Sequence, residues 1–128
     1  MSGDETFPGV CTDWRPHDVP AMWQMLAKED GQHSWDQVTG WRQISELLNF
    51  HSARLRAARD QLAAGWQGGA AGVFLAFIDQ LVGSMDGTAT VAASNSATLA
   101  GITTSLQRAR ESIGQLHDQW QRYSEAER

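Results

Sequence analysis

The residues that could do chemistry in this chain are few, and their spacing does not suit catalysis. Its four histidines (His17, His33, His51 and His117) include no pair four residues apart, the spacing that directs two rings at one metal ion from a helix. Cys11 is the only cysteine, so it has no partner for an internal disulfide. We therefore expect no metal site, no cofactor and no catalytic thiol.

The charged residues also have a simple interpretation. Asp79 and Asp86 are seven residues apart, which places them on similar faces of a helix. With no pocket implied, they are interpreted as solvating charges rather than as an acid/base pair. Arg54, Arg56 and Arg59 are interpreted as a solvated face, and the net charge of −5 argues against a nucleic-acid partner. The sequence contains no P-loop, nucleophile-elbow or dinucleotide motif, so we expect no enzyme activity.

Apolar residues recur in steps of three and four on both sides of Ala64–Gly69, which predicts two amphipathic helices. The glycines at 65, 68 and 69 predict a reversal between them, with Gly65 as the C-cap. His51 falls on the apolar stripe, where we expect a hydrogen-bonded core histidine. His117 is expected to be half exposed.

The fold class predicted is all-α: an antiparallel helical hairpin with unequal arms and a short N-terminal helix. Residues 1–17 are expected to form an extended leader, and 18–128 a single helical-hairpin domain. Its short helix is predicted at about 18–30, capped by Asp18 with Pro20 in the first turn. Long helices are predicted at about 35–64 and 70–124, the first begun by a capping box from Ser34 to Gln37. Gly83 to Gly101 are weak helix formers, so a break there, giving a further helix, is the alternative.

The arms would be roughly 45 Å and on the order of 80 Å long, so the first helix cannot cover the far part of the second. Either the leader and short helix cover that part, or a second chain does. The leader is short and polar, which favours a second chain and a dimeric four-helix bundle. The predicted dimer seam comprises Trp41, Leu48, Leu55, Leu99, Leu106, Ile113, Leu116 and Trp120.

The N-terminal residues lack the apolar segment of a secretory signal, and no apolar run is long enough to span a membrane. If the protein leaves the cytoplasm in which it is made, we expect a route that needs no cleavable signal.

Two short motifs connect this pattern to a family. A Trp-X-Gly turn is formed by Trp66-Gln67-Gly68, and a Tyr-X-X-X-Glu tail is formed by Tyr123 to Glu127. Together with the helical hairpin they resemble the WXG (ESAT-type) family of type VII, or ESX, secretion substrates and partners. The segment from Ala21 to Trp41 is also similar to the first helix of PPE-type proteins, although the Pro-Pro-Glu opening of that group is missing.

The resemblance implies a non-enzymatic protein that is exported as a folded homodimer, or as a heterodimer with another helical-hairpin protein, to the cell surface or beyond. It implies that Trp66 and Gly68 of one chain lie beside Tyr123 and Glu127 of its partner, as a composite signal for the type VII secretion ATPase. Two alternatives stay open: an N-terminal targeting domain of a larger secreted toxin, and a coiled-coil adaptor unrelated to secretion.

Overall fold

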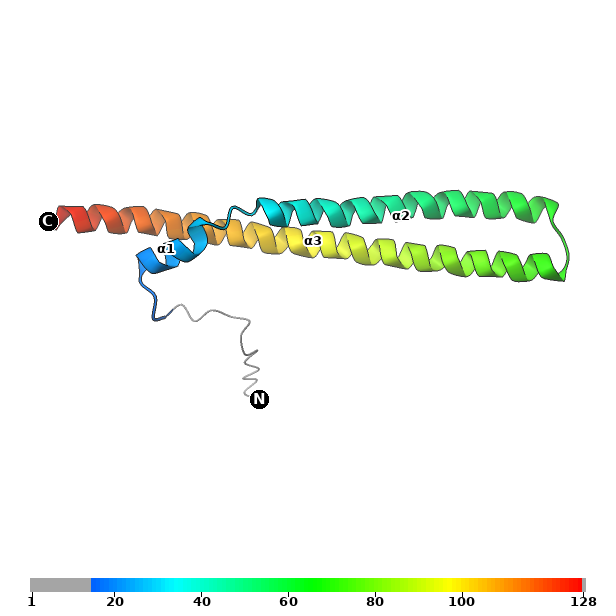
Figure 1. Cartoon of the computed structure of the whole chain (residues 1–128), viewed down its shortest axis with the longest axis horizontal. Helices are drawn as coiled ribbons and strands as arrows, with labels where there is room; N and C mark the ends of the chain where they lie inside the picture. Colours follow the sequence, from blue (N-terminus) through cyan, green and yellow to red (C-terminus); the bar gives the residue numbers. More distant parts are fainter. Residues whose placement is uncertain (1–14, 128) are drawn as a thin grey trace, which may run out of the picture. The chain divides into compact units, whose positions relative to one another are not determined.

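The structure is a computed structural model and describes residues 15–127. These residues form three helices and no strand: α1 (Val19–Ala27), α2 (Gln32–Gly65) and α3 (Gly69–Ala126) (Figure 1). The predicted all-α class is therefore confirmed. Most of the predicted leader 1–17, with Cys11, lies outside the described residues.

The described chain divides into two compact units that share α3. One unit is formed by residues 31–105, that is, by α2 and the first part of α3. The other combines residues 15–30, including α1, with residues 106–127. The two units are described separately below.

The start of α1 follows from local capping. The Asp18 carboxylate accepts a hydrogen bond of 3.0 Å from the backbone N–H of Ala21, and Pro20 occupies the first turn, where its missing N–H costs nothing. The helix ends at Ala27, earlier than the predicted residue 30. The N–H of Lys28 closes it on the carbonyl of Leu26.

The start of α2 differs from the prediction. Gly31 is the N-cap residue, with φ of 74°, and it makes no side-chain cap hydrogen bond. Because this left-handed residue turns the chain before Gln32, Ser34 already lies inside the helix and cannot cap it. The predicted capping box is wrong, and the Gln37 side chain instead lies 3.1 Å from Nε2 of His33.

The connection between α2 and α3 is Trp66-Gln67-Gly68. Trp66, with φ of −122°, is the C-cap of α2, and its N–H donates to the carbonyl of Leu62 at 2.9 Å. Gly65 is thus the last helical residue and not the C-cap. Gly68 has φ of 119°, a conformation that favours glycine, and its carbonyl accepts from Gly72 at 3.2 Å in the first turn of α3.

The weak helix formers in the middle of α3 do not interrupt it. The helix is continuous through Gly83, Gly87 and Gly101. The hydroxyls of Thr88 and Thr90 donate to carbonyls four residues earlier, each at 3.0 Å, so these polar side chains are satisfied within the helix.

In the unit of residues 31–105, α2 runs antiparallel to the first part of α3 (Figure 1). The two helices meet along small side chains. The Ser45 hydroxyl donates to the carbonyl of Ala89 at 2.8 Å, and the Ser96 hydroxyl donates to that of Val38 at 2.9 Å. Most of the buried residues are small, and they recur along each helix at intervals of seven, four or three residues. Small residues repeated on one side of each helix let the two helices approach closely. We call these positions the intrachain seam: Val38, Ser45 and Ser52 on α2, and Ala71, Ile78, Val82, Ala89, Ala92, Ser96 and Thr103 on α3.

The intrachain seam is displaced around α2 from the apolar stripe that the sequence predicts. The buried positions are Val38, Ser45 and Ser52, whereas Trp41 is exposed and His51 is exposed too. The expectation of a core histidine is therefore wrong; the His51 ring lies edge-on to Phe50 at 5.5 Å. Small side chains face the other helix because a bulky stripe between the two helices would force them apart.

In the other unit, α1 packs on residues 106–117 of α3. The Trp23 ring stacks on His117 with centroids 5.6 Å apart, and a Cβ added at Gly114 would lie 3.1 Å from the indole. The Arg110 guanidinium donates to the carbonyl of Ala27 at 3.0 Å. The short helix α1 therefore covers some of the far part of the second long helix. This is the alternative that the sequence did not favour, because the leader is short and polar.

The intrachain seam predicts a strong dependence on side-chain size. Ala89, which is 1 % exposed, faces α2, whereas Ala93 lies on the same helix and is exposed. We expect Ala89→Leu to destabilise the unit by about 1–3 kcal/mol through overpacking. Ala93→Leu, the matched control, should change the free energy of unfolding by less than about 0.5 kcal/mol. Urea unfolding followed by circular dichroism measures both; equal midpoints would contradict the assigned packing.

Candidate interaction surface

One side of the α2–α3 pair carries a continuous set of large apolar side chains, whereas others, such as Leu47, Phe50 and Phe77, are exposed outside it. On both helices most residues of this set come three residues after a residue of the intrachain seam or one residue before it, and Leu62 continues the seven-residue spacing of Leu48 and Leu55. Both stripes are therefore rotated in the same sense away from the contact. For two antiparallel helices that face each other, this rotation brings both stripes to the same side of the pair. We call this surface the apolar face: Trp41, Ile44, Leu48, Leu55 and Leu62 on α2, and Phe74, Leu81, Leu99 and Ile102 on α3.

The apolar face is large enough to be a binding surface. Six of its side chains are between 36 and 60 % exposed. If a large side chain offers roughly 200 Å², these six alone expose on the order of 500 Å². Apolar patches of several hundred Å² on a soluble domain usually mark a site of interaction.

The apolar face is also free of formal charge. None of its nine residues is charged. The residues that continue the same seven-residue spacing between them, His51 on α2 and Thr88 and Asn95 on α3, are not acids, lysines or arginines either. A partner of either sign of charge could approach without burying an unpaired ion, and a second copy would meet no like charge there.

Asp79 and Asp86 of α3 lie beside arginines of α2. Their side chains are 56 and 43 % exposed, so they face solvent, as expected, and also pair across the two helices. Asp86 accepts a short hydrogen bond from the Ser52 hydroxyl and pairs with Arg56 at 2.8 Å. Asp79 accepts two hydrogen bonds from Arg59, at 3.0 and 3.1 Å. These pairs join the two helices of the unit and involve no residue of the apolar face.

These contacts shift two pKa values. The Ser52 hydroxyl, followed by the Arg56 guanidinium, lowers the pKa of the Asp86 carboxyl below its ordinary value. The hydrogen bond and charge of Asp79 raise the pKa of Arg59. Asp86 is therefore ionised at neutral pH, and both acids act as acceptors for α2, which is a structural role.

The predicted turn residues lie at the end of the apolar face. Trp66 is 38 % exposed, and its ring is tilted against Phe74 with centroids 5.6 Å apart. Part of the indole therefore packs on α3 and part stays accessible. Gly68 supplies the left-handed backbone at this turn.

The predicted tail residues belong to the other unit. Tyr123 is 73 % exposed, and the N–H of Glu127 donates to its carbonyl at 3.1 Å in the last turn. Leu116 and Trp120 are exposed at 46 and 44 %. Of the predicted dimer seam, only Leu106 and Ile113 lie beside α1, and both are half-buried.

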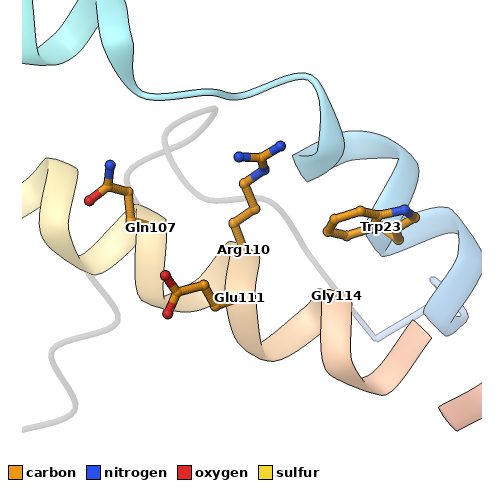
Figure 2. Close-up of a pocket in the computed structure, with 5 residues that line it drawn as sticks. All are labelled: Trp23, Gln107, Arg110, Glu111 and Gly114. Atoms are coloured by element: carbon orange, nitrogen blue, oxygen red, sulfur yellow. The ribbon is translucent and has the colours of Figure 1, made fainter. Parts of the chain in front are cut away.

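Two cavities lie between α1 and α3 in this unit. One, of about 290 Å³, is lined by Trp23, Gln107, Arg110, Glu111 and Gly114; Figure 2 shows the Trp23 ring above Gly114, with Arg110 and Glu111 extending in different directions. The other, of about 260 Å³, is entirely apolar and is lined by Met22, Leu26, Leu106, Ala109 and Ile113. Neither contains a nucleophile next to a base.

The described residues include no group of three or more His, Cys, Asp or Glu side chains that could hold a metal ion. Within residues 15–127, none of the helices combines the length and apolar character needed to cross a bilayer. Comparisons with protein-family models, with curated proteins and with solved structures find no match to this chain.

The Asp86 contacts predict a dependence of stability on pH. Because its pKa is lower in the folded protein than the ordinary 3.8, ionised Asp86 stabilises the fold at and above pH 4, and this stabilisation is lost as the pH falls through the folded pKa. We expect Asp86→Asn to lower the urea midpoint at pH 7 and to match the wild type at the acid end. Asp60→Asn, in which a largely exposed carboxylate is replaced, is the control. A difference in urea midpoint between the wild type and Asp86→Asn that is the same at every pH would contradict the stabilising role of the Asp86 carboxylate.

Proposed function

We propose that this chain is a non-enzymatic substrate or partner protein of a type VII (ESX) secretion system. In this proposal the antiparallel α2–α3 pair is the helical hairpin of a WXG-like protein, and it dimerises into a four-helix bundle. The observation that carries the proposal is the apolar face, which ends at the Trp66-Gln67-Gly68 connection.

The division of side chains between the two sides of α2 supports an intermolecular role. The intrachain seam uses mainly alanine and serine, so the contact between α2 and α3 buries little apolar area for its length. The large side chains point elsewhere. At about 25 cal/mol per Å², burying on the order of 500 Å² of apolar surface per chain is a substantial driving force for association. A second helical pair is a partner of suitable shape, either as a homodimer or as a heterodimer.

The two short motifs supply the link to export. Trp66 and Tyr123 are both accessible, at 38 and 73 %, and Gly68 holds the backbone conformation that the turn requires. In an antiparallel dimer the Trp-X-Gly turn of one chain would lie beside the Tyr-X-X-X-Glu tail of the other. The proposed reader of this composite surface is the type VII secretion ATPase, and the route requires no cleavable signal.

Export from a host with an ESX-type system tests the proposal. We expect Trp66→Ala, Tyr123→Ala and Glu127→Ala each to reduce the secreted fraction at least tenfold while circular dichroism stays unchanged. Val73→Ala and Glu125→Ala are matched controls, because both replace exposed side chains close to the motifs without altering them. Normal secretion of all three motif variants would remove the proposal.

The dimer is tested separately by sedimentation of the purified chain. A mass of two chains at micromolar concentration is expected for a homodimer. Leu48→Asp, which places a charge in the apolar face, should shift the chain toward the monomer because the charge would be buried without a partner. A monomer that also fails to associate with any co-exported helical protein would contradict the proposed assembly.

A further inference from the structure

Helix α1 is poorly fitted to the surface that it covers. None of its nine residues is buried, and Met25 is 46 % exposed. Between Met22 and Leu26 on one side and Leu106, Ala109 and Ile113 on the other lies the apolar cavity of about 260 Å³. This cleft is open to solvent, so the apolar side chains that line it lack part of the dispersion contacts that close helix packing would give them.

The docking of α1 depends on a few contacts. Trp23 lies over Gly114 and stacks on His117, and Arg110 donates one hydrogen bond to the carbonyl of Ala27. Burying Arg110 in this contact costs free energy, because its Nε atom is buried without a hydrogen-bond partner. A helix held mainly by one indole, with a buried donor unsatisfied, can be exchanged for a better-fitting one.

The covered surface continues beyond α1. Leu106, Ala109 and Ile113 are followed, in steps of three and four along α3, by Leu116, Trp120 and Tyr123. The last three are 46, 44 and 73 % exposed. The stripe is therefore one apolar surface, of which α1 occupies the first half only.

We propose that α1 is a removable cover, which competes within the chain with a second copy of the protein for residues 106–117 of α3. The occupant that displaces it is the apolar face of the second copy. This inference rests on the dimerisation included in the proposed function, and adds that release of α1 regulates it.

A second copy fits the requirements of this surface. Its apolar face is uncharged, so it can lie on the stripe without burying an ion. In a two-fold assembly, contact of one chain's stripe with the other's apolar face is made twice, so both bare surfaces of both copies are covered. At roughly 200 Å² for a full side chain, the six exposed residues of the apolar face and the three of the stripe offer on the order of 800 Å² per chain. This is about the area that each partner buries in a stable interface.

Two substitutions in α1 test the competition in opposite directions, and neither residue lies on the surface offered to the second copy. Trp23→Ala removes the indole, so we expect a roughly three- to tenfold lower dissociation constant of the dimer, since the competent state is more populated. Met22→Phe adds volume next to the apolar cavity and should hold α1 more tightly, which raises the dissociation constant. Met25→Ala, an exposed position of the same helix, is the control and should leave it unchanged.

Sedimentation equilibrium of the full chain over a micromolar range measures these constants, and hydrogen exchange of the amides of residues 19–27 reports the release of α1. We expect exchange in this segment to accelerate on dimerisation of the wild type. The proposal is overturned if Trp23→Ala associates more weakly than the wild type, or if the dissociation constant is the same in all variants. It is also overturned if hydrogen exchange of residues 19–27 is slower in the dimer, or if no variant self-associates. The export assay is independent of these results: loss of export in the Trp66 and Tyr123 variants alongside a failed competition would leave the proposed function standing.

Discussion

The close approach of α2 and α3 along small side chains is the constraint on which the unit of residues 31–105 depends. Alanine and serine at the seven-residue positions leave no room between the helices for leucine or tryptophan. Leucines and tryptophans must then lie outside the contact, and the nine residues of the apolar face lie on one side of the antiparallel pair. A chain with this arrangement has a strong hydrophobic driving force directed outward.

Polar groups give this contact a register that apolar packing alone would not. The hydroxyls of Ser45 and Ser96 donate to carbonyls of the opposite helix, and Ser52 and Arg56 both donate to Asp86. A slip of one heptad would preserve small residues at most positions but would separate these donors from their acceptors. Buried groups left unsatisfied would oppose the slip, so the paired hydroxyls specify one alignment among several of similar apolar content.

The sequence alone predicted where the helices lie along the chain, but it did not predict which side of each helix faces the other. Periodicity located α2 and α3 to within a few residues, and Asp18 capped α1 as expected. Steps of three and four, however, mark large apolar residues, and the stripe through Trp41 was adjacent to the buried one through Ser45. Small residues at seven-residue spacing were the missed signal. The pairing of Asp86 with Ser52 and Arg56 required knowledge of which residues face each other, which periodicity does not contain.

The two helices that pack on α3 illustrate different ways of bringing a helix close. Along α2 the approach is distributed over many small contacts, so no single side chain decides it. At α1 it is concentrated in one indole over Gly114, the only helical glycine among the described residues at which a Cβ would meet another side chain. A distributed contact is lost only when the whole pair separates, whereas a concentrated one is lost when a single group moves. The arrangement therefore makes the α2 contact the permanent part of the fold and the α1 contact the part that a competing surface can replace.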